Sequence, residues 1–164
     1  MGMPEPLNAG RIRGGCGVAA GRLCLRAQPP ARFAMDTHPT LTQHVLFTDA
    51  DGRARWRQAP VALTEGKPEA RLSPLAASGG YQLRQSPVGF RSAFHCTGDA
   101  QWVFILQGRM EIGLQDGSAR VFGPGECFYS ADLLPAGASF DPAVHGHCSR
   151  QVGDAPLVTL FVRG

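Results

Sequence analysis

Residues 89–108 decide the fold of this chain and read Gly89-Phe-Arg-Ser-Ala-Phe-His95-Cys-Thr97-Gly-Asp-Ala-Gln101-Trp-Val-Phe-Ile-Leu-Gln-Gly108. The stretch carries a histidine, then a turn, then a carboxamide at the start of an apolar strand that ends at a glycine. A second set follows, with the turn Gly123-Pro124-Gly125, a strand from Cys127 and the triplet His145-Gly146-His147.

The spacing of these residues resembles the cupin family. The first cupin motif runs glycine, five residues, His-x-His, three or four residues, glutamate, six residues and glycine. In this chain Thr97 stands where the second histidine belongs, and Gln101 stands where the glutamate belongs. The resemblance implies an all-β fold over residues 41–164, an antiparallel double-stranded β-helix also called a jelly-roll or cupin barrel, in which the two sets of residues form the two halves of one pocket.

The resemblance also implies a metal site. Its ligands would be His95, Gln101 and His147, with His145 as a further candidate, around a divalent Fe, Mn, Ni, Zn or Cu ion. Residues two apart in a strand face the same way, so His145 and His147 would both point into the barrel. Alternatively, His145 lies in the preceding loop. Glutamine in place of glutamate leaves a bound cation with more of its positive field, which favours anionic ligands.

The strand 101–107 has two apolar faces. Gln101, Val103 and Ile105 share one face, whereas Trp102, Phe104 and Leu106 share the other, and we expect both to be buried. A glutamine on an apolar strand needs hydrogen-bond partners, which predicts that it lines the pocket; the alternative is a place at the wet end of the strand. The predicted ligand pocket consists of Thr97, Val103, Ile105 and Tyr129.

Several functions fit this pattern, because cupin barrels include dioxygenases, isomerases, decarboxylases and non-enzymatic binders. The first hypothesis is a protein that binds a small polar or anionic molecule, through a metal or directly. The second is a metal-free binding or sensor module that uses the same side chains as hydrogen-bonding groups. The third is a metal-free acid–base isomerase or epimerase, which needs a partner such as Tyr129 for the histidine that moves the proton. Whether the chain is an enzyme stays open.

The composition of the chain indicates its fold class and which classes of binding partner to expect. The chain has 164 residues, enough for one domain, and its 21 Gly and 13 Pro favour an all-β fold. Residues 1–34 hold five Arg and one Glu, whereas the remainder is nearly neutral, so no nucleic acid is expected as a partner. No apolar run is long enough to predict a membrane span. Five cysteines without Cys-x-x-Cys spacing favour reduced thiols and a cytoplasmic location.

Two segments depart from a compact cupin. Residues 1–40 are predicted to be a disordered extension, or a segment ahead of a translation start at Met35. The connection after Ser130 is long and carries Leu133, Leu134 and Phe140, which predicts a segment that covers the pocket near His147. The family resemblance further implies a homodimer that pairs across a sheet edge.

Overall fold

The computed structural model describes residues 38–164, and the predicted N-terminal extension lies outside them except for its last three residues. The strands are β1 (Thr40–Thr48), β2 (Ala54–Ala62), β3 (Glu65–Lys67), β4 (Ala70–Leu72), β5 (Gly80–Ser86), β6 (Gln101–Gln107), β7 (Arg109–Gly113), β8 (Ala119–Phe122), β9 (Cys127–Ala131), β10 (Cys148–Val152) and β11 (Leu157–Arg163). This part of the chain contains no helix, and so none that is long and apolar enough to cross a membrane.

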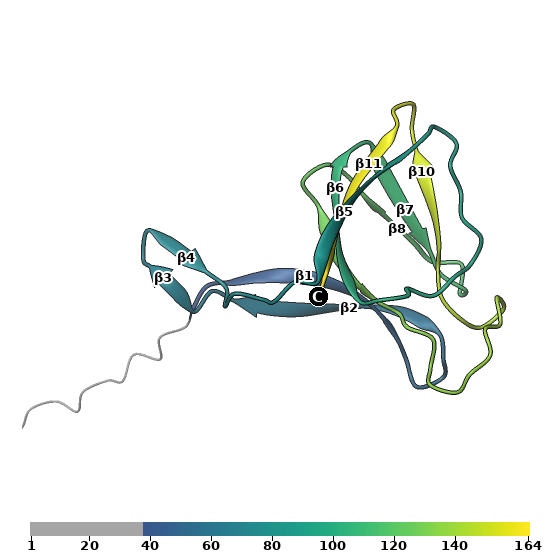
Figure 1. Ribbon diagram of the computed structural model, residues 1–164, viewed down its shortest axis with the longest axis horizontal. Helices are drawn as coiled ribbons and strands as arrows, with labels where there is room; N and C mark the ends of the chain where they lie inside the picture. The colour runs from purple at the N-terminus through teal and green to yellow at the C-terminus, as the bar shows by residue number, and fades with distance from the viewer. Residues whose placement is uncertain (1–37) are drawn as a thin grey trace, which may run out of the picture. The chain divides into compact units, whose positions relative to one another are not determined.

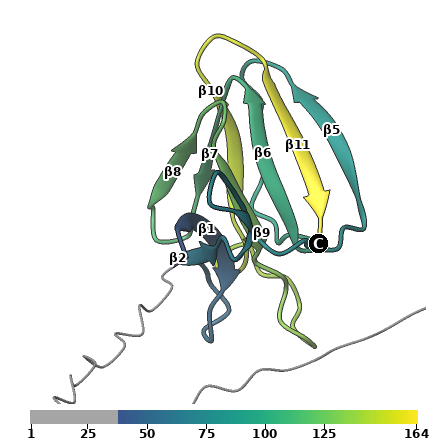
Figure 2. The ribbon, with the colours of Figure 1, turned by 90° about the vertical axis from the view of Figure 1, so that its left-hand side faces the viewer.

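The barrel consists of two sheets that face each other (Figure 2). One sheet has the order β2-β1-β9-β6-β11-β5 and the other has the order β10-β7-β8. A fourth segment joins the smaller sheet without forming a regular strand, through the antiparallel bridges Arg91–Arg150 and His95–His147. Four antiparallel members in each sheet, β9-β6-β11-β5 against this segment with β10-β7-β8, make up an eight-stranded jelly roll. The predicted all-β jelly-roll fold is therefore confirmed.

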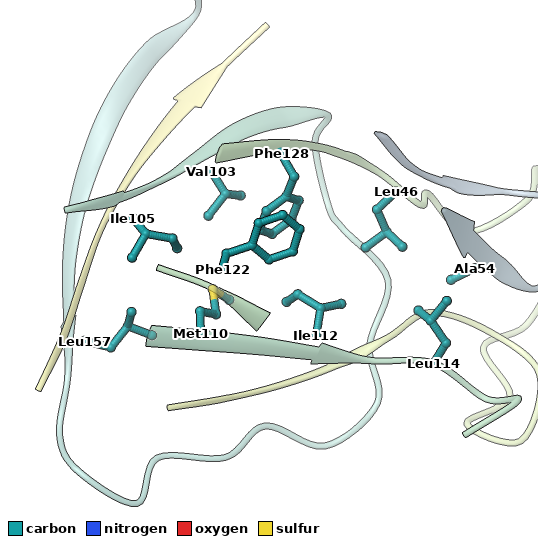
Figure 3. Close-up of a cluster of buried hydrophobic side chains, with 10 residues drawn as sticks. All are labelled: Leu46, Ala54, Val103, Ile105, Met110, Ile112, Leu114, Phe122, Phe128 and Leu157. Carbon is teal, nitrogen blue, oxygen red and sulfur yellow. The ribbon is translucent and has the colours of Figure 1, made fainter. Parts of the chain in front are cut away.

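The core fills the space between the two sheets (Figure 3). It follows from strand alternation, because every second residue of a strand points to the same side. In β6, Val103 and Ile105 are buried, and in β7 Met110 and Ile112 are buried opposite them. Phe122 and Phe128 pack with their ring centroids 4.6 Å apart. The inward assignment of Val103 and Ile105 is confirmed.

The outer face of β6 differs from the prediction. Trp102 and Phe104 are only half-buried, and Leu106 is 50% exposed. Trp102 stacks on Phe104 and meets Tyr129 of β9 edge-on, with centroids 5.9 and 5.5 Å apart. The expected burial on both faces is wrong for this side, because the segment before β5 covers it only in part.

The hairpin β1–β2 extends the larger sheet beyond the barrel (Figure 1). β1 pairs in parallel with β9 at Val45–Phe47 and antiparallel with β2 along its full length. The turn between them is closed by a hydrogen bond from the Gly52 amide to the Asp49 carbonyl, 2.9 Å long. Leu46 and Ala54, which lie near the turn of this hairpin, belong to the buried hydrophobic core of the barrel.

Candidate functional site

The site is built around two neighbouring histidines. His95 and His147 exchange both backbone hydrogen bonds, each with an N–O distance of 2.9 Å. Their ring centroids lie 4.6 Å apart at an interplanar angle of 49°. The backbones approach this closely because residue 146 is glycine: a Cβ there would lie 2.1 Å from the His95 carbonyl oxygen. The sequence motifs around the two histidines thus meet in space, as predicted for the two halves of one pocket.

His147 is held by a buried carboxylate, Asp132, which is the main site residue that sequence reasoning missed. The Nδ1 of His147 donates to Asp132 Oδ2 at 2.6 Å. The hydroxyls of Thr97 and Ser130 bond to Asp132 Oδ1 at 2.5 and 3.2 Å and to each other at 2.7 Å. Asp132 is 0% exposed and His147 5% exposed. A carboxylate bound at Nδ1 fixes the imidazole tautomer and leaves Nε2 as a free acceptor.

A signal for Asp132 is present in the sequence. Phe128 and Ser130 point inward from β9, and alternation carries the same direction one residue past the end of the strand to Asp132. The sequence analysis assigned this residue to the long connection. An aspartate two residues after an inward-facing serine is the feature that would have identified it.

His95, like His147, has its Nδ1 atom bonded to an oxygen and its Nε2 atom free. His95 is exposed at the edge of the barrel, and its Nδ1 bonds to the Ala93 carbonyl oxygen at 2.9 Å. Its Nε2 is therefore free, like that of His147. Both rings line a pocket of about 120 Å³ together with three further predicted residues, Thr97, Gln101 and Val103. Gln101 thus lies at the pocket rather than only at a solvated strand end.

Three predicted site residues lie elsewhere. His145 is in the loop before His147, where its Nδ1 accepts a hydrogen bond from the Asp141 amide at 2.9 Å. Ile105 is 1% exposed in the core and does not line the pocket. Tyr129 faces the opposite side of β9, against Trp102. We therefore correct the predicted set by removing these three, and the proton-transfer partner expected at Tyr129 is absent from the pocket.

The connection after Asp132 does not cover the pocket. Leu133, Leu134 and Phe140 are 40%, 36% and 43% exposed, and none of them lines it. The segment is attached at the other side, where Thr48 Oγ1 donates to the Leu133 carbonyl at 2.7 Å and Gln115 donates to the Pro142 carbonyl. The predicted covering segment is wrong, because its contacts run to the β1–β2 turn and to the β7–β8 turn.

Arg84 of β5 is a further pocket residue that the sequence analysis did not select. Its guanidinium lies 4.8 Å from the ring centroid of Phe161 and 5.4 Å from that of Phe90. It lines the histidine pocket and also an adjoining cleft of about 360 Å³, which shares Gln101 and Phe161 with the pocket. Burial lowers the pKa of Arg84. The alternating pattern of β5 was the available signal, since it places Arg84 on the same face as Ser86.

Cys96 also lines the pocket, next to His95. Burial raises the pKa of its thiol, and the negative charge of Asp132 raises it further. A thiol with a raised pKa carries little thiolate at neutral pH, so Cys96 does not have the setting of a nucleophile.

The donors at the pocket fit a metal ion only in part. His95 and His147 each have Nδ1 bound to an oxygen and Nε2 free, as metal-ligating histidines do. Gln101 is the neutral third donor. No group of three or more His, Cys, Asp or Glu side chains in residues 38–164 is arranged to hold a metal.

Comparison with known proteins gives a likeness among solved structures alone. No family model matches the chain, and no curated protein matches it. Among solved structures, it is similar to the cupin domain of Cnp3 from Schizosaccharomyces pombe, at 10% sequence identity and a TM-score of 0.38 over 76% of this chain and 83% of that one. The two facing sheets, the strand order and the bridges between the two motif segments describe a jelly-roll barrel. The chain has an all-β jelly-roll fold.

Proposed function

We propose that this chain binds a small polar or anionic molecule in the pocket between His95 and His147. The observation that carries the proposal is the pair of free Nε2 atoms, since the Nδ1 atom of each ring is already bound to an oxygen. Two acceptors of fixed tautomer in one pocket suit a ligand that carries hydroxyl or amide donors. Gln101 adds a group that both donates and accepts hydrogen bonds at the same pocket.

The burial of His147 supports a binding role over a merely structural one. A buried Asp–His pair costs desolvation free energy, and its hydrogen bonds to Thr97 and Ser130 offset that cost. The Asp132–His147 pair leaves Nε2 of His147 without a hydrogen-bond partner among the described residues. Such a nitrogen can orient a ligand in a pocket that polar and apolar side chains line together.

The test uses imidazole nitrogen resonances, read by NMR while small molecules are added to the full chain. The probes are glycerol, acetamide, glycolate and acetate. His147→Asn is the informative variant, because the asparagine amide nitrogen replaces Nδ1 and still donates to Asp132, whereas the pocket nitrogen is lost. His145→Asn is the matched control outside the pocket.

We expect at least one probe to shift the His95 and His147 resonances of the wild type and of His145→Asn. The same probe should bind His147→Asn at least about tenfold more weakly, since a hydrogen bond inside the pocket contributes about 1.5 kcal/mol. Failure of all four probes to shift either histidine would contradict the proposal.

A first-row divalent metal is the second candidate occupant, favoured by the free Nε2 atoms. When bound, it would be held by His95, His147 and Gln101, and it would act as a Lewis acid toward an anionic ligand. Elemental analysis of the purified chain beside His147→Asn tests this. Near-stoichiometric metal that is lost in the variant supports it, and wild-type protein that stays metal-free after incubation with each ion contradicts it.

The variant Gln101→Glu refines the metal test. Thr97 is bonded to Asp132, so replacing Thr97 by histidine would break the network that holds His147. Gln101→Glu alone restores the carboxylate of the family motif without disturbing that network. A metal site predicts a clear rise in metal affinity, whereas a metal-free pocket predicts no change in metal affinity.

A further inference from the structure

Arg84 has an unusual setting for a cation in the interior of a barrel. Its Nε and Nη2 atoms are buried and have no hydrogen-bond partner among the described residues. The ion pairs found in residues 38–164 do not include it either. The rings of Phe90 and Phe161 give partial compensation through cation–π contact. Two buried donor atoms without acceptors still cost stability, which calls for a partner from outside the chain.

The two unpartnered atoms form one edge of the guanidinium, and this molecule already uses that edge to hold a carboxylate. Arg150 donates from Nε to Glu111 Oε1 at 2.6 Å and from Nη2 to Oε2 at 2.7 Å. Such bidentate pairs match the planar fork of arginine to the planar carboxylate. The free edge of Arg84 is thus the donor half of an arginine–carboxylate pair that lacks its acceptor.

Arg84 is placed to meet the same ligand as the histidines. It lines the pocket with His95 and His147, and with Gln101 it also lines the adjoining cleft. We propose that Arg84 binds the carboxylate of the ligand through Nε and Nη2, so that the ligand is a small carboxylic acid whose remaining polar groups lie against His95 and His147. This proposal rests on the proposed function, of which it names the ligand class.

The first experiment follows the Nε–H resonance of Arg84 while acetate is added to the full chain. Acetamide, of the same shape but uncharged, and inorganic phosphate are the comparison probes. Arg84→Met removes the fork while keeping most of the side-chain volume. The matched control is Arg109→Met, because Arg109 is exposed and forms no ion pair among the described residues.

We expect acetate to shift the Arg84 resonance and to raise the melting temperature of the wild type and of Arg109→Met. Its affinity should fall at least about tenfold in Arg84→Met, as for the loss of a charge-assisted hydrogen bond. Acetate that binds Arg84→Met as tightly as the wild type overturns the proposal. A rise in melting temperature with phosphate but not with acetate overturns the carboxylate assignment.

The outcomes separate this proposal from the one on which it rests. If glycerol or acetamide shifts His95 and His147 equally in the wild type and Arg84→Met while acetate has no effect, the pocket binds a ligand but Arg84 does not hold a carboxylate. If no probe shifts either histidine, both proposals fall.

Stability in the absence of ligand gives an independent readout. If the role of Arg84 is to bind a ligand, Arg84→Met should have the same melting temperature as the wild type or a higher one. The reason is that the substitution removes a charged group whose buried donors have no acceptor. A clear loss of stability would mean that Arg84 serves the fold and would overturn the proposal. Should Arg84→Met fail to fold in ligand-free buffer, that result counts as such a loss. Arg84→Lys, which keeps the charge but not the fork, is a second variant for the acetate titration and is expected to bind acetate weakly.

Discussion

Asp132 is the residue on which the geometry of the site depends. Its carboxylate receives hydrogen bonds from His147, Thr97 and Ser130 in a fully buried position. These donors have no other acceptor of comparable strength nearby. Removing the charge therefore weakens every bond of the network at once.

We predict that Asp132→Asn lowers the free energy of unfolding by about 2–4 kcal/mol, the range for weakening a buried charged network. Chemical denaturation measures the change. The control is Asp154→Asn, since Asp154 is exposed and forms no hydrogen bond or ion pair among the described residues. Equal stability of the two variants would show that the Asp132 network does not support the fold.

The thiol of Cys96 provides a pH-dependent test of the same site. Its pKa is raised by burial and by the charge of Asp132. A raised pKa keeps the thiol protonated at neutral pH, so the reactive thiolate forms only as the pH rises above the range of a free cysteine. We predict that iodoacetamide alkylates Cys96 more slowly in the native than in the unfolded chain at neutral pH, and that the difference narrows in alkaline solution. Mass spectrometry of the Cys96 peptide measures both rates, and equal rates at neutral pH would contradict the prediction.

At the scale of elements, the close contact between β10 and the segment 91–95 depends on Gly146. This residue has a φ of +76°, and a Cβ would lie 2.1 Å from the His95 carbonyl oxygen. Because the clash is with backbone, a rotamer change does not relieve it. The segment and His147 would have to separate, which breaks the two hydrogen bonds that bring the imidazoles together.

We predict that Gly146→Ala loses about 3 kcal/mol or more of stability, since it adds a backbone clash to the roughly 1–2 kcal/mol cost of a positive φ. Gly137→Ala is the matched control, with a φ of +75° and nothing within 4 Å of the added Cβ, so it bears the φ cost alone. Thermal denaturation of both variants gives the comparison. A Gly146→Ala protein as stable as Gly137→Ala would contradict the close approach.

At the scale of the whole described molecule, the outer face of the larger sheet is apolar and only partly covered. Tyr81, Leu83 and Leu106 are 72%, 65% and 50% exposed, next to the half-buried Trp102 and Phe104. The patch runs onto β5, the end strand of its sheet, which pairs only with β11. An exposed apolar face that continues to a free strand edge is a surface that self-association covers.

We therefore predict a homodimer formed through this face, with about twice the 17.5 kDa mass of the chain by light scattering. The double variant Leu83→Lys with Leu106→Lys should be monomeric, because it places charges in the centre of the interface. Val121→Lys on β8 of the other sheet is the control and should stay dimeric. A monomeric wild type would contradict the prediction.

The resemblance to the cupin motifs predicted the barrel, and local alternation predicted which residues of a strand share a face. Alternation along residues 101–107 assigned Val103 and Ile105 to the interior, and the two motif segments were expected to form one pocket. These predictions depend on interactions that repeat along the chain, namely strand periodicity and turns at glycine. The same reasoning was wrong for His145, because alternation holds only inside a strand and this residue lies in a loop.

What the sequence by itself determined is therefore the all-β architecture and the place of His95, Gln101 and His147 at one pocket. Only the tertiary structure decided that Asp132 holds His147, that Tyr129 faces away, and that Arg84 reaches the same pocket from β5. The physical reason is that these contacts join residues far apart in the chain. Their partners are set by how the two sheets pack, and no local period or spacing encodes that packing.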